Sequence, residues 1–176
     1  MMMNTITPTS TINNYKDKLP DHVHIFPVEH HEHYKPIVLE SIENMKTDNN
    51  IKLNKKRYYY DFDIPKAERT YEKLFKQITF PYINDLEETY GICLEHKPTL
   101  WFQQYTQGSD FGWHQHNGHW ACIYYVELPD RSEATEFLNY GQFNVKEGDM
   151  VFFPAFLVHR SPTIKSNLRK TIIATN

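Results

Sequence analysis

The sequence has little cysteine and no long apolar stretch, and both absences restrict the kind of protein it encodes. Cys93 and Cys122 are the two cysteines among 176 residues, and they form neither a CxxC pair nor a regular framework. A disulfide-based fold from an oxidising compartment is therefore not indicated. No segment approaches the roughly 20 apolar residues of a membrane span, and the N-terminal segment lacks the basic start and apolar run of a signal peptide. We therefore expect a cytoplasmic protein.

Neither sign of charge dominates the composition. The chain has 19 Lys and Arg against 22 Asp and Glu, a formal net charge of −3. A protein with this net charge has no overall positive electrostatic field that would attract nucleic acid or an anionic membrane, so we expect neither as a general partner. The length suits one domain with its own apolar core. Aromatic residues make up 15% of the chain, and there are ten histidines.

Two helices are expected in the first half of the chain. Apolar residues recur at helical spacing from Ile37 to Met45, and the segment TDNN that follows predicts the end of this helix. A second helical pattern runs from Ala67 to Tyr90, and Pro81 is predicted to interrupt or kink it. The basic and aromatic segment between them, IKLNKKRYYYDFDIP, is predicted to be a loop.

The second half of the chain has a residue pattern that is typical of short β-strands. The segments TLWFQQYT, WACIYYVEL, TEFLNY, DMVFFP and KTIIAT are rich in β-branched and aromatic residues, and turn signals separate them. Many short strands after two helices favour a sandwich or barrel over a parallel βαβ sheet. We predict one domain over residues 1–176: a flexible arm or edge strand at 1–21, a helical support region at 22–95 and a β catalytic core at 96–176.

Three histidines in the second half are spaced as metal ligands. His114 and His116 are two residues apart in a strand-like segment, so their imidazoles would project from one face. His159, after the apolar run DMVFFPAFLV, is the candidate third ligand. Two ligands from one strand and a third from a later strand leave three adjacent metal positions open, an arrangement typical of non-haem Fe(II) oxygenases.

Other polar residues are weaker ligand candidates. His119 would reach the same metal only through a tight turn, so we interpret it as a supporting or turn residue. Asp110, in the turn QGSDFG, is not expected to supply a carboxylate. Five histidines near the N-terminus, in which no carboxylate or thiolate completes a ligand set, are interpreted as a polar loop and helix start: His22, His24, His30, His31 and His33.

Arg169 lies ten residues after His159 in the sequence and is a candidate ligand-binding residue. Arg169, in LRKTIIATN, would bind a carboxylate with two hydrogen bonds if its strand lies beside the metal; otherwise it is a surface cation. Thr171 faces the same way and can donate its hydroxyl. Tyr105 shares a strand face with Trp101 and Gln103, which would line a pocket or pack in the core.

Taken together, these segments resemble the 2-oxoglutarate/Fe(II)-dependent dioxygenases over about 80 of the 176 residues, from Thr99 to Asn176. The resemblance is greatest to the oxygenases found in marine phages and bacteria and extends to the prolyl-hydroxylase branch. If the protein is of phage origin, the resemblance implies that it acts in the host cytoplasm. It rests on WFQQYTQG, the HQH segment in the place of the family's ligand motif, CIYYVELP, GDMVFFPAFLVH, and the Arg and Thr of LRKT. The resemblance implies a mainly β fold with N-terminal helices, built on a double-stranded β-helix (a cupin-like jelly roll).

The resemblance also implies the cofactors and the residues that hold them. Fe(II) would be bound by His114, His116 and His159, with 2-oxoglutarate and O₂ as co-substrates of a hydroxylase. The distal carboxylate of 2-oxoglutarate would reach Arg169, with Thr171, Tyr125 and Tyr105 as further cofactor-binding residues. No catalytic residue beyond the metal ligands is implied. The substrate stays open among protein side chains, with peptidyl proline as one candidate, nucleotides and small metabolites.

One departure from the family pattern leaves alternatives open. His116 stands where the family usually has a carboxylate, and a neutral imidazole does not offset a charge of Fe(II). Three-histidine iron sites occur in cupin-type dioxygenases that need no 2-oxoglutarate, so that chemistry is one alternative. A cupin-like binding protein without catalysis is a second. A zinc-dependent hydrolase or isomerase is a third, although no Glu in the ligand strands would serve as its general base.

Overall fold

The structure, a computed structural model, describes residues 20, 22–94 and 99–176. Two long helices, α1 (His31–Asp48) and α2 (Glu72–Tyr90), and two short 3₁₀ helices, η1 (Lys66–Glu68) and η2 (Arg131–Glu133), accompany ten strands. The strands are β1 (His24–Pro27), β2 (Tyr58–Tyr60), β3 (Leu100–Tyr105), β4 (Phe111–His114), β5 (Trp120–Glu127), β6 (Glu136–Phe137), β7 (Gly141–Gln142), β8 (Asp149–Pro154), β9 (His159–Ser161) and β10 (Lys170–Thr175). Neither long helix, in this described part of the chain, has the length and apolar character that a membrane span requires.

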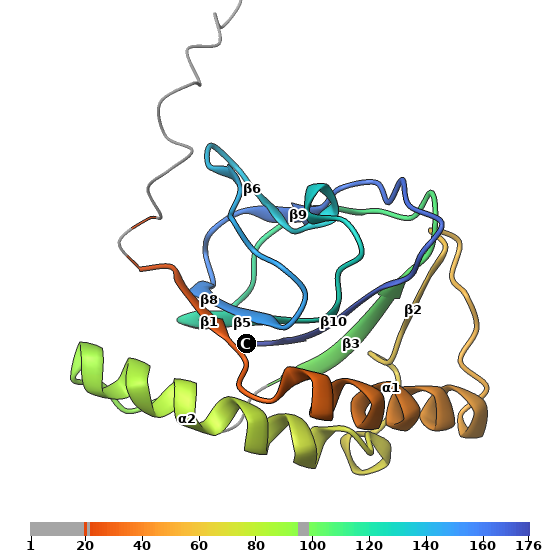
Figure 1. Ribbon diagram of the computed structural model, residues 1–176, viewed down its shortest axis with the longest axis horizontal. Coiled ribbons are helices and arrows are strands. Elements are labelled where there is room, and N and C mark those ends of the chain that lie inside the picture. The colour runs from red at the N-terminus through yellow and green to blue at the C-terminus, as the bar shows by residue number, and fades with distance from the viewer. Residues whose placement is uncertain (1–19, 21, 95–98) are drawn as a thin grey trace, which may run out of the picture.

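The strands form two antiparallel sheets. The larger sheet has six strands in the order β1-β8-β5-β10-β3-β2, and the smaller has four in the order β4-β9-β6-β7. Figure 1 shows α1 and α2 along one side of the larger sheet, with β6 and β9 of the smaller sheet on its other side. The larger sheet is therefore the middle layer of the molecule, covered on both faces.

Successive side chains along the strands of the middle sheet point to opposite faces, and this divides the buried apolar residues into two clusters. Trp101 and Tyr105 of β3 belong to the inner cluster, which lies between the two sheets. Phe102 of the same strand belongs to the outer cluster, together with apolar residues of α1 and α2. In β10, Ile172 is in the inner cluster and Ile173 in the outer one. Because both faces are covered, these strands are buried along nearly their whole length.

The predicted mainly β architecture with N-terminal helices is confirmed at this level, with two corrections. The segment predicted as a loop contains β2, whose tyrosines pair with β3. The second helix begins at Glu72 rather than Ala67 and continues through Pro81 to Tyr90 without interruption. The predicted arm at residues 1–21 falls almost entirely outside the described residues.

A buried ion pair fastens the segment before α2 to the middle sheet. Asp61 is 1% exposed and accepts hydrogen bonds from the Phe102 amide at 2.9 Å and the Tyr71 hydroxyl at 2.6 Å. The Arg69 guanidinium lies 3.4 Å from the same carboxylate and donates to the Asp61 carbonyl at 3.0 Å. These contacts join a loop, a helix terminus and strand β3 in one buried network.

Replacing Asp61 with alanine is expected to lower the free energy of unfolding by about 3–5 kcal/mol, because the Arg69 charge stays buried without its partner. Urea unfolding followed by circular dichroism measures this loss. The exposed neighbour Asp63 provides the matched control, and its replacement with alanine should change stability by less than about 0.5 kcal/mol. Equal effects at the two positions would show that the buried pair is not an important contact.

Candidate active site

The structure brings His114, His116 and His159 together at the lining of a cavity. Strands β4 and β9 pair so that His114 lies opposite His159. His116 is two residues farther along, and its backbone amide donates to the Ala155 carbonyl at 2.9 Å, which ties this segment to the end of β8. One nitrogen from each imidazole lies within 4.8 Å of the others. In the described part of the chain, no other group of three potential metal-ligating residues comes this close.

Backbone carbonyls orient two of the three imidazoles. Nδ1 of His114 lies 2.8 Å from the Gly112 carbonyl oxygen, and Nδ1 of His159 lies 2.8 Å from the Leu157 carbonyl oxygen. A carbonyl can only accept, so each Nδ1 carries the hydrogen and donates it. The lone pair of each ring is then on Nε2, the tautomer that a metal needs.

Burial keeps the three rings neutral. Desolvation lowers the pKa of His159 to about 3 and the pKa of His116 to about 4, and it lowers the pKa of His114 as well. The neighbouring imidazoles disfavour protonation of His159 and His116 further. Three neutral imidazoles with convergent nitrogens are a donor set that suits Fe(II), and equally Zn(II) or Cu(II). The residues therefore fit a divalent metal ion.

The lowered pKa values make the metal-free protein sensitive to acid. An unfolded histidine takes up a proton near its ordinary pKa of 6.5, whereas in the folded protein the pKa of all three imidazoles is lowered, to about 3 for His159 and about 4 for His116. The unfolded state thus binds more protons in this window, and stability falls as the pH drops below about 6.5. Urea unfolding at about pH 7 and about pH 5 tests this. A His159→Asn variant should lose part of the pH dependence, and an unchanged dependence would contradict the assignment to these rings.

A cavity of about 350 Å³ is lined in part by the three histidines. Apolar and aromatic side chains such as Trp101, Phe111 and Phe153 form much of its lining, and Gln103 and Tyr105 contribute polar groups. The Tyr105 hydroxyl donates to the Gln103 side-chain oxygen at 2.9 Å. Burial strongly raises the pKa of Tyr105, so its phenol stays protonated. The predicted place of Tyr105 at a pocket wall agrees with this lining.

Beside this cavity is a buried cation that the sequence analysis did not single out. The Lys170 side chain is fully buried, and its Nζ donates to the Ser161 hydroxyl at 2.9 Å and to the Glu133 carbonyl at 2.6 Å. Nζ also lies 5.0 Å from the ring centroid of Tyr105. Ser161 and Tyr105 both line the cavity. Lys170 therefore contacts two side chains that line the cavity, although it does not line the cavity itself.

The charge of Lys170 is poorly compensated. Desolvation lowers the pKa of its amine to about 7, although the Glu133 carboxylate partly opposes this. An ammonium group has three donors, and two of them have the partners named above. A carboxylate entering the cavity would supply the missing negative charge.

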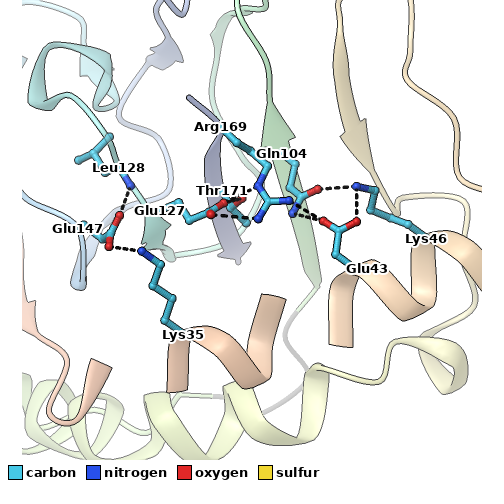
Figure 2. A network of polar contacts seen from close by, with 9 residues as sticks. All are labelled: Lys35, Glu43, Lys46, Gln104, Glu127, Leu128, Glu147, Arg169 and Thr171. Carbon is cyan, nitrogen blue, oxygen red and sulfur yellow. Dashed lines mark hydrogen bonds and ion pairs between the residues drawn. The ribbon is translucent and has the colours of Figure 1, made fainter. Parts of the chain in front are cut away.

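Arg169 and Thr171 lie on the other side of the middle sheet. Figure 2 shows them in a polar network between this sheet and α1. The Arg169 guanidinium donates two hydrogen bonds to Glu127, at 2.7 and 3.0 Å, and one to Glu43 of α1 at 2.6 Å. The Thr171 hydroxyl donates to the same Glu127 carboxylate. The two residues share a face, as expected, but it is the face that packs against the helix.

The same network extends along α1. Lys46 donates to Glu43 at 2.9 Å and to the Gln104 side-chain oxygen at 2.8 Å. Farther along the helix, Lys35 pairs with Glu147, which also accepts the Leu128 amide at 3.0 Å. These contacts fix the helix to strands β3, β5 and β10, and they occupy the Arg169 side chain with two carboxylates.

The remaining predicted residues fall at various distances from the metal site. Tyr125 points into the inner cluster, where its hydroxyl accepts the Thr135 amide at 3.1 Å and burial raises its pKa to about 12. His119 and Asp110 are outside the histidine cluster. The N-terminal histidines contact other parts of the structure: His31 lies 2.7 Å from the Tyr124 hydroxyl, and His24 lies 2.6 Å from the Tyr90 hydroxyl.

Comparison with known proteins was made by sequence and by structure. The sequence matches no described protein family and no curated protein. Among solved structures, it is similar to an oxidoreductase of the 2OG-Fe(II) oxygenase family from Burkholderia pseudomallei, with a TM-score of 0.60 and 9% identity over 88% of this chain and 82% of that one.

Two further solved structures give the same result. A prolyl hydroxylase from Trichoplax adhaerens, in complex with a hypoxia-inducible-factor peptide, has a TM-score of 0.64 and 11% identity over 88% of this chain and 82% of its own. A non-haem α-ketoglutarate-dependent carbocyclase of nogalamycin biosynthesis has a TM-score of 0.66 and 9% identity over 88% and 78%. At these identities the likeness concerns the fold, and the chain has the fold of the 2OG-Fe(II) oxygenases.

Proposed function

We propose that the protein is a non-haem Fe(II) dioxygenase that couples oxidative decarboxylation of 2-oxoglutarate to hydroxylation of a substrate. The observation that carries this proposal is the arrangement of one cavity, which is lined by three neutral imidazoles and has a poorly compensated buried ammonium beside it. When bound, Fe(II) and 2-oxoglutarate activate O₂ to oxidise a C–H bond, with succinate and CO₂ as products. The two sheets around this cavity are assigned to a double-stranded β-helix.

The residues of this chain would hold the reactants without taking part in bond making. His114, His116 and His159 would bind the metal through their unprotonated nitrogens. Lys170 would bind the distal carboxylate of 2-oxoglutarate, with the Ser161 and Tyr105 hydroxyls as further donors. This assignment replaces Arg169 and Thr171, whose side chains are engaged by Glu127. The aromatic walls exclude water from the metal, which protects a reactive site from side reactions.

Residues 1–176 are proposed to form a single domain. Strands β1 and β2, from the region expected to be helical support, complete the sheet that β3, β5, β8 and β10 build. The cavity wall and its support thus come from both halves of the chain. A protein side chain is one candidate substrate, because the Trichoplax adhaerens structure holds a peptide, and peptidyl proline remains one candidate within that class.

The second candidate function is a dioxygenase that needs no 2-oxoglutarate. It is favoured by His116, since three imidazoles bring no negative charge to the metal. In such an enzyme the substrate itself would occupy the open metal positions, and Lys170 would bind an anionic substrate.

Anaerobic reconstitution distinguishes these candidates. The protein is loaded with Fe(II) and titrated with 2-oxoglutarate, and the visible charge-transfer band of the iron complex is recorded. The proposed function predicts a saturable band and, on addition of O₂, formation of succinate. Bound iron without a band would refute the assignment of 2-oxoglutarate and favour the second candidate. A failure to bind iron at all would refute both.

A further inference from the structure

Glu133 is a buried carboxylate that lies behind the wall of the cavity. It is the last residue of η2 and is 1% exposed. Its Oε1 accepts hydrogen bonds from the backbone amides of Lys165 at 2.8 Å and Ser166 at 2.6 Å. In the part of the chain that the structure describes, its Oε2 is buried without a hydrogen-bond partner. A buried charge with an unpaired oxygen costs stability, so its place beside the cavity needs an explanation.

Glu133 acts on Lys170 through its backbone and through its charge. The Glu133 carbonyl accepts a hydrogen bond from Nζ of Lys170 at 2.6 Å. The Glu133 carboxylate holds the backbone of Lys165 and Ser166, in the segment between β9 and β10, and Lys170 is the first residue of β10. Desolvation lowers the pKa of the Lys170 amine, and the charge of the same carboxylate opposes this. One residue thus holds the amine in place and favours its charged form.

The other titratable groups near Lys170 do not compensate its charge. Tyr105 and Tyr125 lie in the same interior, and burial raises the pKa of both, so their phenols stay protonated and neutral. Asp110 contributes to the raised pKa of Tyr105. Among the described residues, Glu133 is the carboxylate whose charge opposes the desolvation of Lys170.

We infer that Glu133 is a positioning residue for Lys170, which keeps the amine charged and in place beside the cavity and so widens the pH range in which an anionic co-substrate binds. The inference rests on the proposed function, in which Lys170 binds the distal carboxylate of 2-oxoglutarate. Glu133 does not line the cavity, so it acts through Lys170. An amine without its proton has no charge to offer a carboxylate. Above the pKa of Lys170, binding must therefore take up a proton, and the affinity falls about tenfold per pH unit.

Glu133→Gln removes the charge and keeps the shape. Glutamine has the same length, and its side-chain oxygen can still accept the amides of Lys165 and Ser166. Without the carboxylate, the pKa of Lys170 should fall. For each unit of that fall, the affinity for 2-oxoglutarate at high pH should drop about tenfold, because less of the amine is charged. At a pH where Lys170 is charged in both proteins, the affinity should be unchanged.

Two measurements on the complete chain follow this change. The first is the pKa of Lys170 without metal or co-substrate, from the NMR shift of its ε-carbon in protein with isotope-labelled lysine, with Lys170→Met to identify the signal. The second is the anaerobic charge-transfer titration of Fe(II)-loaded protein with 2-oxoglutarate, at pH values on either side of about 7. Glu127→Gln is the matched control, because Glu127 lies on the helix side of the sheet, where it binds Arg169 and Thr171. It should change neither the pKa nor the pH range of binding.

Glu133→Asp is the complementary variant, which keeps the charge and shortens the side chain. Its hydrogen bonds to Lys165 and Ser166 should weaken, whereas the upper pH limit of 2-oxoglutarate binding should stay as in the unmodified protein. A pH limit that moves in Glu133→Asp but not in Glu133→Gln would show that the backbone contacts matter and the charge does not, which refutes the inference.

The outcomes separate this inference from the proposed function. We expect the pKa of Lys170 and the upper pH limit of binding to fall together in Glu133→Gln. A lower pKa of Lys170, with no binding of 2-oxoglutarate by the unmodified protein at any pH, supports Glu133 as the residue that keeps Lys170 charged and refutes the proposed function. Binding that weakens equally at every pH in Glu133→Gln, or an unchanged pKa of Lys170, refutes the inference and leaves the proposed function intact.

Discussion

Replacing His159 with alanine is expected to weaken Fe(II) binding by at least about 100-fold, since even supporting residues around a metal site change affinity by about 10- to 100-fold. His159 is the most buried of the three imidazoles, and the carbonyl of Leu157 fixes its tautomer. The two histidines that remain would hold the ion at two positions only. Activity that depends on the metal should be lost together with the affinity.

Anaerobic dialysis against graded Fe(II), with iron measured in the protein fraction, gives the affinity. His119→Ala is the matched control, because His119 is only three residues from His116 but lies outside the cluster. This variant should bind Fe(II) as the unmodified protein does. A His159→Ala protein that is folded and binds iron normally would show that the three histidines are not a metal site. A His116→Asp variant should bind Fe(II) more tightly, because the carboxylate offsets part of the metal's charge.

Replacing Lys170 with methionine is expected to lower the affinity for 2-oxoglutarate by about 10- to 100-fold. A hydrogen bond to a charged group contributes about 1.5–3 kcal/mol, and tenfold in affinity corresponds to about 1.4 kcal/mol. Methionine has a similar length and no charge, so it fills the buried space that the lysine stem leaves. Iron binding should be unchanged, because Lys170 contacts none of the three histidines.

The adjacent residue supplies the matched comparison. Arg169→Met removes a cation just before the same strand, but the Arg169 guanidinium binds Glu127 and Glu43 on the helix side of the sheet. Its affinity for 2-oxoglutarate should stay within about twofold of the unmodified protein's, while its stability falls because two carboxylates lose a partner. Both affinities come from the charge-transfer titration. A large loss in Arg169→Met with none in Lys170→Met would restore the assignment that the sequence suggested.

The metal-ligand candidates could be predicted from the sequence because their signal is local. His114 and His116 are two residues apart, the spacing that projects from one face of a strand, although β4 ends at His114 and His116 lies just beyond it. His159 was expected at the end of the apolar strand that precedes it, whereas the structure places it at the start of the next strand, β9, opposite His114. The helices were foreseen for the same reason, since the apolar spacing from Ile37 to Met45 lies within α1. None of these predictions needed a contact between distant segments.

The cation beside the cavity could not be chosen from the sequence, because both faces of β10 are buried. In a sheet with one wet face, polar residues mark the exposed side. In KTIIAT the burial is nearly continuous. The alternation of side chains along the strand therefore places Arg169 and Thr171 on one face, but it does not show whether that face is the cavity side or the helix side. The burial of Lys170 among Ser161, Glu133 and Tyr105 depends on residues far away in the sequence. Similarly, β2 was missed because its three tyrosines are paired only through β3.

The separation of the layers has an evolutionary consequence. Helices α1 and α2 pack on the outer face of the middle sheet, whereas two of the three candidate ligands belong to strands of the smaller sheet and the third follows one of them. A substitution on either helix therefore reaches the histidines only through the sheet. The sequences of α1 and α2 can therefore change during evolution as long as the residues that pack on the sheet stay apolar. Chains as different as 9–11% in identity can then keep a common sheet framework while their outer surfaces diverge.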